Sequence, residues 1–217
     1  MIPSLQTIIN NCLITCNALV PTHGWPLKSK WKTYWIDPKK IVLMQAGEPR
    51  RGFDKRGRIS ILRYGKVLSG DWDLKTLPIK DTALYRGIYQ RFCLGMKWSK
   101  TDLYPSRLKI EHPASSTNAW VEKADDHAYF FRKMNNIESL YKSISKRKID
   151  EKMIKRKGFY KDFMFINVGR SGELIRNSGG LHRLIICQIL EVDRIPVYVH
   201  TIHREACPHL EQGVIVL

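Results

Sequence analysis

Residues 162–199 read DFMFINVGRSGELIRNSGGLHRLIICQILEVDRIPVYV. The runs 162–168 and 173–177 are rich in Phe, Ile, Leu and Val, which predicts two strands. Between them, Gly169-Arg170-Ser171-Gly172 has the composition of a tight turn. Two strands joined by so short a turn pair antiparallel, so this segment predicts a β-hairpin.

The chain then continues into a predicted helix and a further strand. Leu181–Glu191 carries apolar residues at helical spacing, and Ile195–Val199 is rich in β-formers after a short turn at 192–194. A hairpin followed by a helix and a strand predicts an α+β fold, with a small mixed sheet and helices.

The N-terminal side of this unit adds further strands. Trp31–Ile36 is aromatic and β-branched and is ended by Asp37-Pro38, which predicts a strand. The runs 59–62 and 66–69 flank Tyr64-Gly65 and predict a second hairpin.

Two helices are predicted in the middle of the chain. Residues 81–96 have apolar side chains at helical spacing and end at Gly95. Residues 125–157 contain one apolar stripe, formed by Ile137, Leu140, Tyr141 and Ile144.

The predicted elements divide the chain into a lead-in and one domain, and two segments are distinguished within that domain. Residues 1–30 are a poorly patterned lead-in, and 31–217 form a single domain. Within that domain, about 81–160 is a mainly helical, basic insertion, and 162–203 is the core unit.

Composition limits the classes of function. The chain has 217 residues, 37 Lys and Arg against 20 Asp and Glu, and a net charge of +17. Such an excess favours a polyanionic partner, although a basic surface also aids solubility. No apolar run is long enough to cross a membrane, and five scattered cysteines favour a reducing, cytoplasmic location.

The positive charge is concentrated between residues 133 and 161, where ten Lys and Arg residues face three Asp and Glu residues. Such a run is either a solvated helix face or an anion-binding face. If it contacts DNA or RNA, it does so through phosphates, without reading the sequence. The candidate nucleic-acid-binding residues are Lys146, Arg147, Lys148, Lys155, Arg156 and Lys157.

The segment Ser178-Gly179-Gly180-Leu181-His182-Arg183 lies between a predicted strand and a predicted helix. The first N–H groups of a helix have no internal partner and carry partial positive charge, so they attract anions. Glycine lets a phosphate approach the backbone closely. The candidate phosphate-binding residues of this segment, called the phosphate loop below, are Ser178, Gly179, Gly180, His182 and Arg183.

The region from Phe163 to His203 resembles the core of the ParB/sulfiredoxin-like superfamily. The matching features are the hairpin, Gly-Gly-Leu-His-Arg-Leu at the start of the helix, and Asp-Arg-Ile-Pro-Val on the last strand. The resemblance implies a fold that holds a nucleotide (ATP, ADP or CTP) at the phosphate loop. Activities in that superfamily range from DNA clamping to phosphotransfer, so the fold does not fix the function.

One residue departs from the pattern of a superfamily branch. Sulfiredoxins carry a cysteine where this chain has Leu181, so reduction of a sulfinic acid is not expected.

Three carboxylates are candidate catalytic acids: Glu48, Asp71 and Asp73. On a strand, Asp71 and Asp73 share one face and together bind Mg²⁺ through the phosphates of a nucleotide. The alternative is that they cap backbone N–H groups in a turn. The His and Cys residues between 200 and 209 lack the spacing of a closed zinc site, so we predict no metal site from protein ligands alone.

Two functions of different classes follow. The first is nucleotide binding with hydrolysis or phosphotransfer. The second is a non-catalytic, sequence-nonspecific nucleic-acid-binding module.

Overall fold

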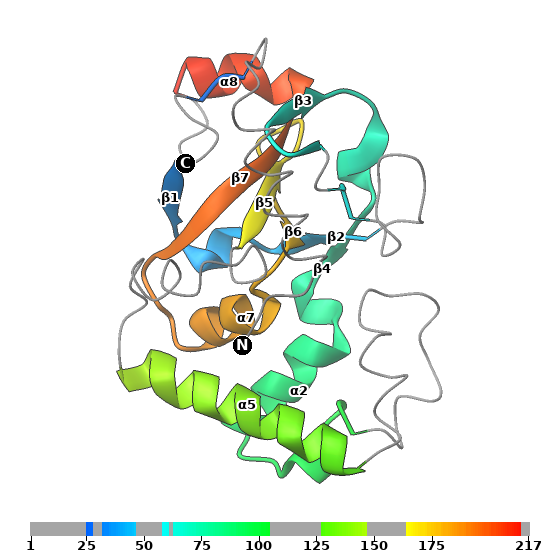
Figure 1. The fold of residues 1–217 in the computed structure, drawn as a ribbon, viewed down its shortest axis with the longest axis vertical. Helices are drawn as coiled ribbons and strands as arrows, with labels where there is room; N and C mark the ends of the chain where they lie inside the picture. Colours follow the sequence, from blue (N-terminus) through cyan, green and yellow to red (C-terminus); the bar gives the residue numbers. More distant parts are fainter. Residues whose placement is uncertain are drawn as a thin grey trace, which may run out of the picture.

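The structure, a computed structural model, describes residues 25–27, 32–46, 58–60, 63–104, 127–146 and 164–213. These residues form a mixed sheet with helices packed against it (Figure 1). The predicted α+β class is confirmed.

The sheet has seven strands in the order β1-β7-β5-β6-β2-β4, with β3 also paired to β7. Their bounds are β1 Thr33–Ile36, β2 Leu43–Gln45, β3 Lys66–Leu68, β4 Thr76–Pro78, β5 Phe165–Val168, β6 Leu174–Ser178 and β7 Ile195–His203. The predicted β5–β6 hairpin is present, and its strands pair antiparallel. β5 and β7 run parallel, because β6 returns the chain to the end of the sheet where β5 begins and α7 then carries it past β5 to β7.

The hairpin predicted around Tyr64-Gly65 is described only in part, because residues 61–62 lie outside the described ranges. A turn is found there, but β3 pairs in parallel with the end of β7, and the Gly65 N–H donates to the His200 carbonyl at 2.7 Å. β7 is longer than the predicted 195–199 and continues to His203. Its second half therefore extends past β1 and offers an edge on which β3 pairs.

Four α-helices belong to the described residues: α2 Ala83–Phe92, α5 His127–Lys146, α7 Leu181–Ile189 and α8 Cys207–Glu211. The first three confirm predicted helices, although residues 147–157 of the second predicted helix lie outside the described part of the chain. None of the helices in the described ranges combines the length and apolarity that crossing a bilayer requires.

One face of the sheet is apolar and forms the main core. Paired residues on neighbouring strands share a face, and on this face Met44, Ile166 and Val199 are buried. α7 packs here between α2 and α5 (Figure 1). The predicted stripe of α5 contributes to this core through buried Ile137 and Ile144. Burial of these apolar groups is the main stabilising term of the fold.

The other face carries buried polar groups and is covered by residues 59–60 and 63–75. Gln45 Nε2 donates to the carbonyls of Trp72 (2.8 Å) and Lys75 (3.1 Å). Asn167 Nδ2 donates in turn to Gln45 Oε1 at 3.2 Å. Because a buried amide is costly without a partner, these bonds fix the covering segment in one place on the sheet.

The turn after α7 is closed by two backbone hydrogen bonds. Val192 N donates to Cys187 O at 2.9 Å, and Glu191 N donates to Gln188 O at 3.4 Å, which is the Schellman arrangement. Glu191 has φ +50°, a conformation that side chains rarely adopt and that glycine takes at little cost. Its carboxylate pairs with Lys39 Nζ at 2.8 Å on the surface.

We therefore expect Glu191→Gly to be more stable than Glu191→Ala by about 1 kcal/mol, because both lose the ion pair and only alanine keeps the strained φ. Chemical denaturation of the two variants measures the difference. Equal stabilities would contradict the left-handed conformation of residue 191.

Candidate functional site

The phosphate loop turns on two glycines in the left-handed region. Gly179 has φ +69° and Gly180 has φ +58°, directly between β6 and α7. A Cβ at Gly180 would lie 2.9 Å from Met164 Cε, so a larger residue would be strained by both its backbone and its neighbour. The glycines thus allow the sharp turn that sequence analysis assigned to them.

Gly180 is the N-cap of α7, and no side chain caps this end of the helix. Ser178, one of the candidate phosphate-binding residues, is the buried last residue of β6. The first N–H groups of α7 have no partner within the helix and point away from its N-terminus. A phosphate placed there meets N–H donors and the positive end of the helix dipole.

Two cations that sequence analysis did not select lie near this loop. Arg176 is buried on β6, and its Nε donates to the Gly179 carbonyl at 3.1 Å. Burial, together with the nearby charges of Arg176 and Lys133, lowers the pKa of His182 to about 4. The imidazole of His182 is therefore neutral near pH 7. The positive potential at the loop comes from Arg176 on the strand and Lys133 on α5.

The sequence contained one signal for Arg176. It is the only charged residue inside the run Leu174–Ser178, where a strand buried on both faces has no need of one. A cation in such a place serves a specific partner, here the loop carbonyl of Gly179.

Asp71 and Asp73 lie in the 3-10 helix η3 (Asp71–Leu74), so the strand interpretation is wrong. The alternative, a turn in which an aspartate accepts from a backbone N–H, agrees with the structure for Asp73. Both aspartates bind Arg170 from the β5–β6 turn. Arg170 Nε donates to Asp73 Oδ2 at 2.8 Å, and Arg170 Nη2 donates to Asp73 Oδ1 and Asp71 Oδ1, each at 2.9 Å. The Arg170 backbone N–H also donates to Asp73 Oδ2 at 2.9 Å.

These aspartates lie at the opposite end of β6 from the phosphate loop. Arg170 precedes β6 and Gly179 follows it, and the five residues of β6 span ~15 Å at ~3.3 Å per residue. Asp71 and Asp73 are thus occupied by Arg170 and far from a phosphate at the loop. The third candidate acid, Glu48, lies outside the described residues.

His203 lies beside Asp73, and we call Asp71, Asp73, Arg170 and His203 the Arg170 cluster. His203 Nε2 donates to the Gly70 carbonyl at 2.9 Å, since a carbonyl only accepts, and its Nδ1 accepts from Glu205 N at 3.2 Å. Both ring nitrogens are thus used by a neutral imidazole, whose Nε2 lies 4.0 Å from Asp73 Oδ1. Burial alone would raise the pKa of Asp73, but the hydrogen bonds from the Arg170 side chain and backbone hold it below its ordinary value.

His200 lies apart from this cluster, between Tyr64 and Phe165. Thr201 Oγ1 donates to the Arg63 carbonyl at 3.3 Å, so it accepts from His200 Nδ1 at 2.8 Å, which fixes the Nδ1–H tautomer. Burial, with the nearby charge of Arg58, lowers the pKa of His200 to about 3. Among the residues with described positions, no group of three or more His, Cys, Asp or Glu is placed to hold a metal ion.

Of the predicted nucleic-acid-binding residues, the structure describes one. Lys146 is exposed at the end of α5. The other candidates lie outside the described residues: Arg147, Lys148, Lys155, Arg156 and Lys157. Binding of DNA or RNA through this segment stays a prediction from the sequence.

Comparisons of the chain with protein-family models, with curated proteins and with solved structures found no match. The resemblance to the ParB/sulfiredoxin-like superfamily therefore stays a prediction from the sequence.

The Arg170 cluster predicts different effects for its two aspartates. Asp73→Asn should lower the free energy of unfolding by about 1–3 kcal/mol, because a buried carboxylate loses charged hydrogen bonds. Asp71→Asn is the matched control and should change stability little, because the Asp71 side chain is 75% exposed.

The same pair tests the sign of the pKa shift. A carboxyl with a lowered folded pKa stabilises the protein above its ordinary pKa and loses that contribution as the pH falls below it. Below about pH 4, the free energy of unfolding from chemical denaturation should therefore fall more steeply with decreasing pH for the wild type than for Asp73→Asn. Parallel curves would exclude a lowered pKa for Asp73.

Buried His182 and His200 predict a second pH effect. In the unfolded protein both imidazoles have an ordinary pKa of about 6.5. Below that pH the unfolded state therefore binds more protons than the folded state. Stability should therefore decrease as the pH falls from about 6.5 towards 4. His200→Gln should flatten this slope in chemical denaturation, whereas the exposed His209→Gln should leave it unchanged. An unchanged slope in His200→Gln would show that the pKa of His200 is not lowered in the folded protein.

Proposed function

We propose that the chain binds the phosphate groups of a nucleotide at the phosphate loop. The observation that carries this proposal is the uncapped N-terminus of α7, opened by two left-handed glycines beside Arg176. Three features favour an anion there: the backbone N–H groups of a helix start, the helix dipole and nearby cations. The resemblance seen in the sequence adds that the anion belongs to ATP, ADP or CTP.

The nature of the cations supports a phosphate as the ligand. Arg176 is held by the loop carbonyl, so it fixes the loop and raises its potential rather than reaching out to the ligand. Arg183, on the first turn of α7, is partly exposed and suits a bidentate contact with phosphate oxygens. His182, neutral near pH 7, supplies a hydrogen bond and no charge.

The proposal is for binding and does not extend to hydrolysis or phosphotransfer. The two described candidate acids, Asp71 and Asp73, are bound to Arg170 at the other end of β6. Mg²⁺ would accordingly arrive with the nucleotide, held by its phosphates and water, as is usual for this ion.

The test is a calorimetric titration with ATP, ADP, CTP and GTP, each with and without Mg²⁺. We expect one base to bind best, and Arg183→Ala to weaken its binding by about 1.5–3 kcal/mol, the value of a charge-assisted contact. Arg204→Ala, an exposed arginine beyond the end of β7, is the matched control and should bind as the wild type does.

Two results would contradict the proposal. The first is the absence of binding at millimolar nucleotide. The second is equal affinity in the wild type and in a His182→Ala, Arg183→Ala double variant that keeps its thermal stability. Salt-dependent binding to DNA or RNA in either case would favour the nucleic-acid-binding alternative.

A further inference from the structure

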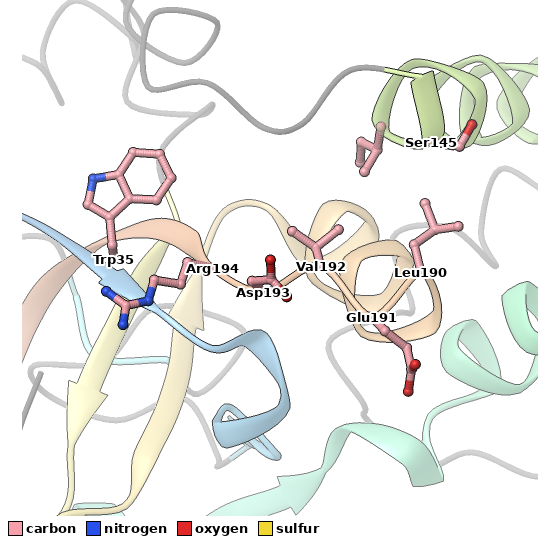
Figure 2. Close-up of a pocket in the computed structure, with 8 residues that line it drawn as sticks. Trp35, Ser145, Leu190, Glu191, Val192, Asp193 and Arg194 are labelled. Atoms are coloured by element: carbon pink, nitrogen blue, oxygen red, sulfur yellow. The ribbon is translucent and has the colours of Figure 1, made fainter.

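A cleft of about 590 Å³ lies at the C-terminal end of α7, at the opposite end of the helix from the phosphate loop. Three parts of the fold line it (Figure 2): Trp35 from β1, the end of α5, and the turn between α7 and β7. The lining residues are Trp35, Ile144, Ser145, Leu190, Glu191, Val192, Asp193 and Arg194. We call it the Trp35 cleft. Its size lies within the range of small-ligand sites.

The walls of the Trp35 cleft are largely apolar. The Trp35 side chain is 38% exposed, although it lies on a strand. Leu190 and Val192 are partly buried, and Ile144, from α5, is buried. An exposed indole opposite aliphatic side chains is suited to an apolar or aromatic group of a ligand.

One acidic and one basic side chain, Asp193 and Arg194, are among the lining residues of the cleft. Figure 2 shows Asp193 between Arg194 and Val192, and it shows the Arg194 guanidinium beside the backbone of Trp35, directed away from the indole ring. Asp193 and Arg194 are both exposed, and within the described ranges neither makes a hydrogen bond or an ion pair. Glu191, in contrast, pairs with Lys39. Two opposite charges on consecutive residues therefore border the same cleft without partners in the described structure.

The backbone that carries these charges is fixed. On one side of Asp193 and Arg194, the backbone of Glu191 and Val192 is held by the two hydrogen bonds that close the turn after α7. On the other side, Ile195 begins the buried strand β7. The backbone between two such anchors loses little freedom when a ligand binds, so only the side chains have to be ordered.

We propose that the Trp35 cleft binds a zwitterionic α-amino acid with an apolar or aromatic side chain. The carboxylate of the ligand pairs with Arg194, and its ammonium group pairs with Asp193. Its side chain packs against Trp35, Leu190 and Val192. An α-amino acid carries both charges on one carbon, which matches the adjacent Asp193 and Arg194, and charge-assisted bonds to both are the strong ones.

This inference does not depend on the phosphate loop. The nine residues of α7 separate the two sites by ~13 Å along the helix axis. Arg183→Ala should therefore leave the Trp35 cleft unchanged, and the failure of one proposal does not imply failure of the other.

The experiment is a calorimetric titration of the full chain with L-phenylalanine, L-leucine and glycine. L-phenylalaninamide, which lacks the carboxylate, and N-acetyl-L-phenylalanine, which lacks the ammonium, complete the set. We expect L-phenylalanine or L-leucine to bind. Glycine and both blocked derivatives should bind more weakly, by about tenfold or more, because each loses one of the three contacts.

Three variants assign the contacts. Arg194→Gln should bind L-phenylalanine and its amide alike, and Asp193→Asn should bind L-phenylalanine and its N-acetyl derivative alike. Trp35→Ala should lose the preference for L-phenylalanine over glycine. All three residues are exposed or partly exposed, and thermal unfolding confirms that each variant is folded. Glu191→Gln, at a residue that lines the same cleft but pairs with Lys39, is the matched control.

The proposal fails if no amino acid binds at millimolar concentration. It also fails if N-acetyl-L-phenylalanine binds as tightly as L-phenylalanine, since that result assigns the cleft to the C-terminus of a peptide. Equal binding of glycine and L-phenylalanine would exclude the apolar walls from recognition.

Discussion

β7 is the strand on which the rest of the structure depends. All nine of its residues are buried, and three other strands pair with it: β1 and β3 along one edge and β5 along the other. A strand enclosed in this way forms only when segments far apart in sequence come together. Its parallel pairing with β5 also requires a crossover, which α7 supplies. The phosphate loop and the Trp35 cleft are the two ends of that crossover helix.

Local signals in the sequence were sufficient to predict the unit around α7. The β5–β6 turn, the glycines at 179 and 180 and the start of α7 all depend on the backbone preferences of neighbouring residues. The length of β7 was missed because His200 and Thr201 look like the end of a strand. Their side chains are nevertheless buried, since each finds a hydrogen-bond partner that the sequence does not reveal.

The candidate acids could not be assigned correctly for a similar reason. The two aspartates were visible in the sequence, but their partner Arg170 is 97 residues from Asp73 along the chain. Arg170 itself lies in a turn, where a charged residue is ordinarily solvated. Only the fold shows that this turn meets η3, so only the fold shows that Asp73 is an anchor for the hairpin. The role of Arg176 near the phosphate loop also depends on distant parts, because Lys133 reaches the same place from α5.

The net charge of +17 explains why the two ends of α7 differ. Several acidic side chains of the described residues are committed to internal pairs: Asp73 with Arg170, Asp102 with Arg86, and Glu138 with Arg91. Such pairing leaves the excess of cations to set the potential at the phosphate loop, where the helix dipole has the same sign.

At the other end of α7 the dipole is reversed, and Asp193 lies beside Arg194 in the Trp35 cleft. A polyanion is therefore favoured at the first end, and a ligand that carries both charges at the second. α7 itself is held by four consecutive buried residues, Leu184–Cys187. Because this buried segment fixes the helix against the sheet, a substitution at one end has no route to the other except by displacing the core. Binding free energies at the two ends should accordingly be additive.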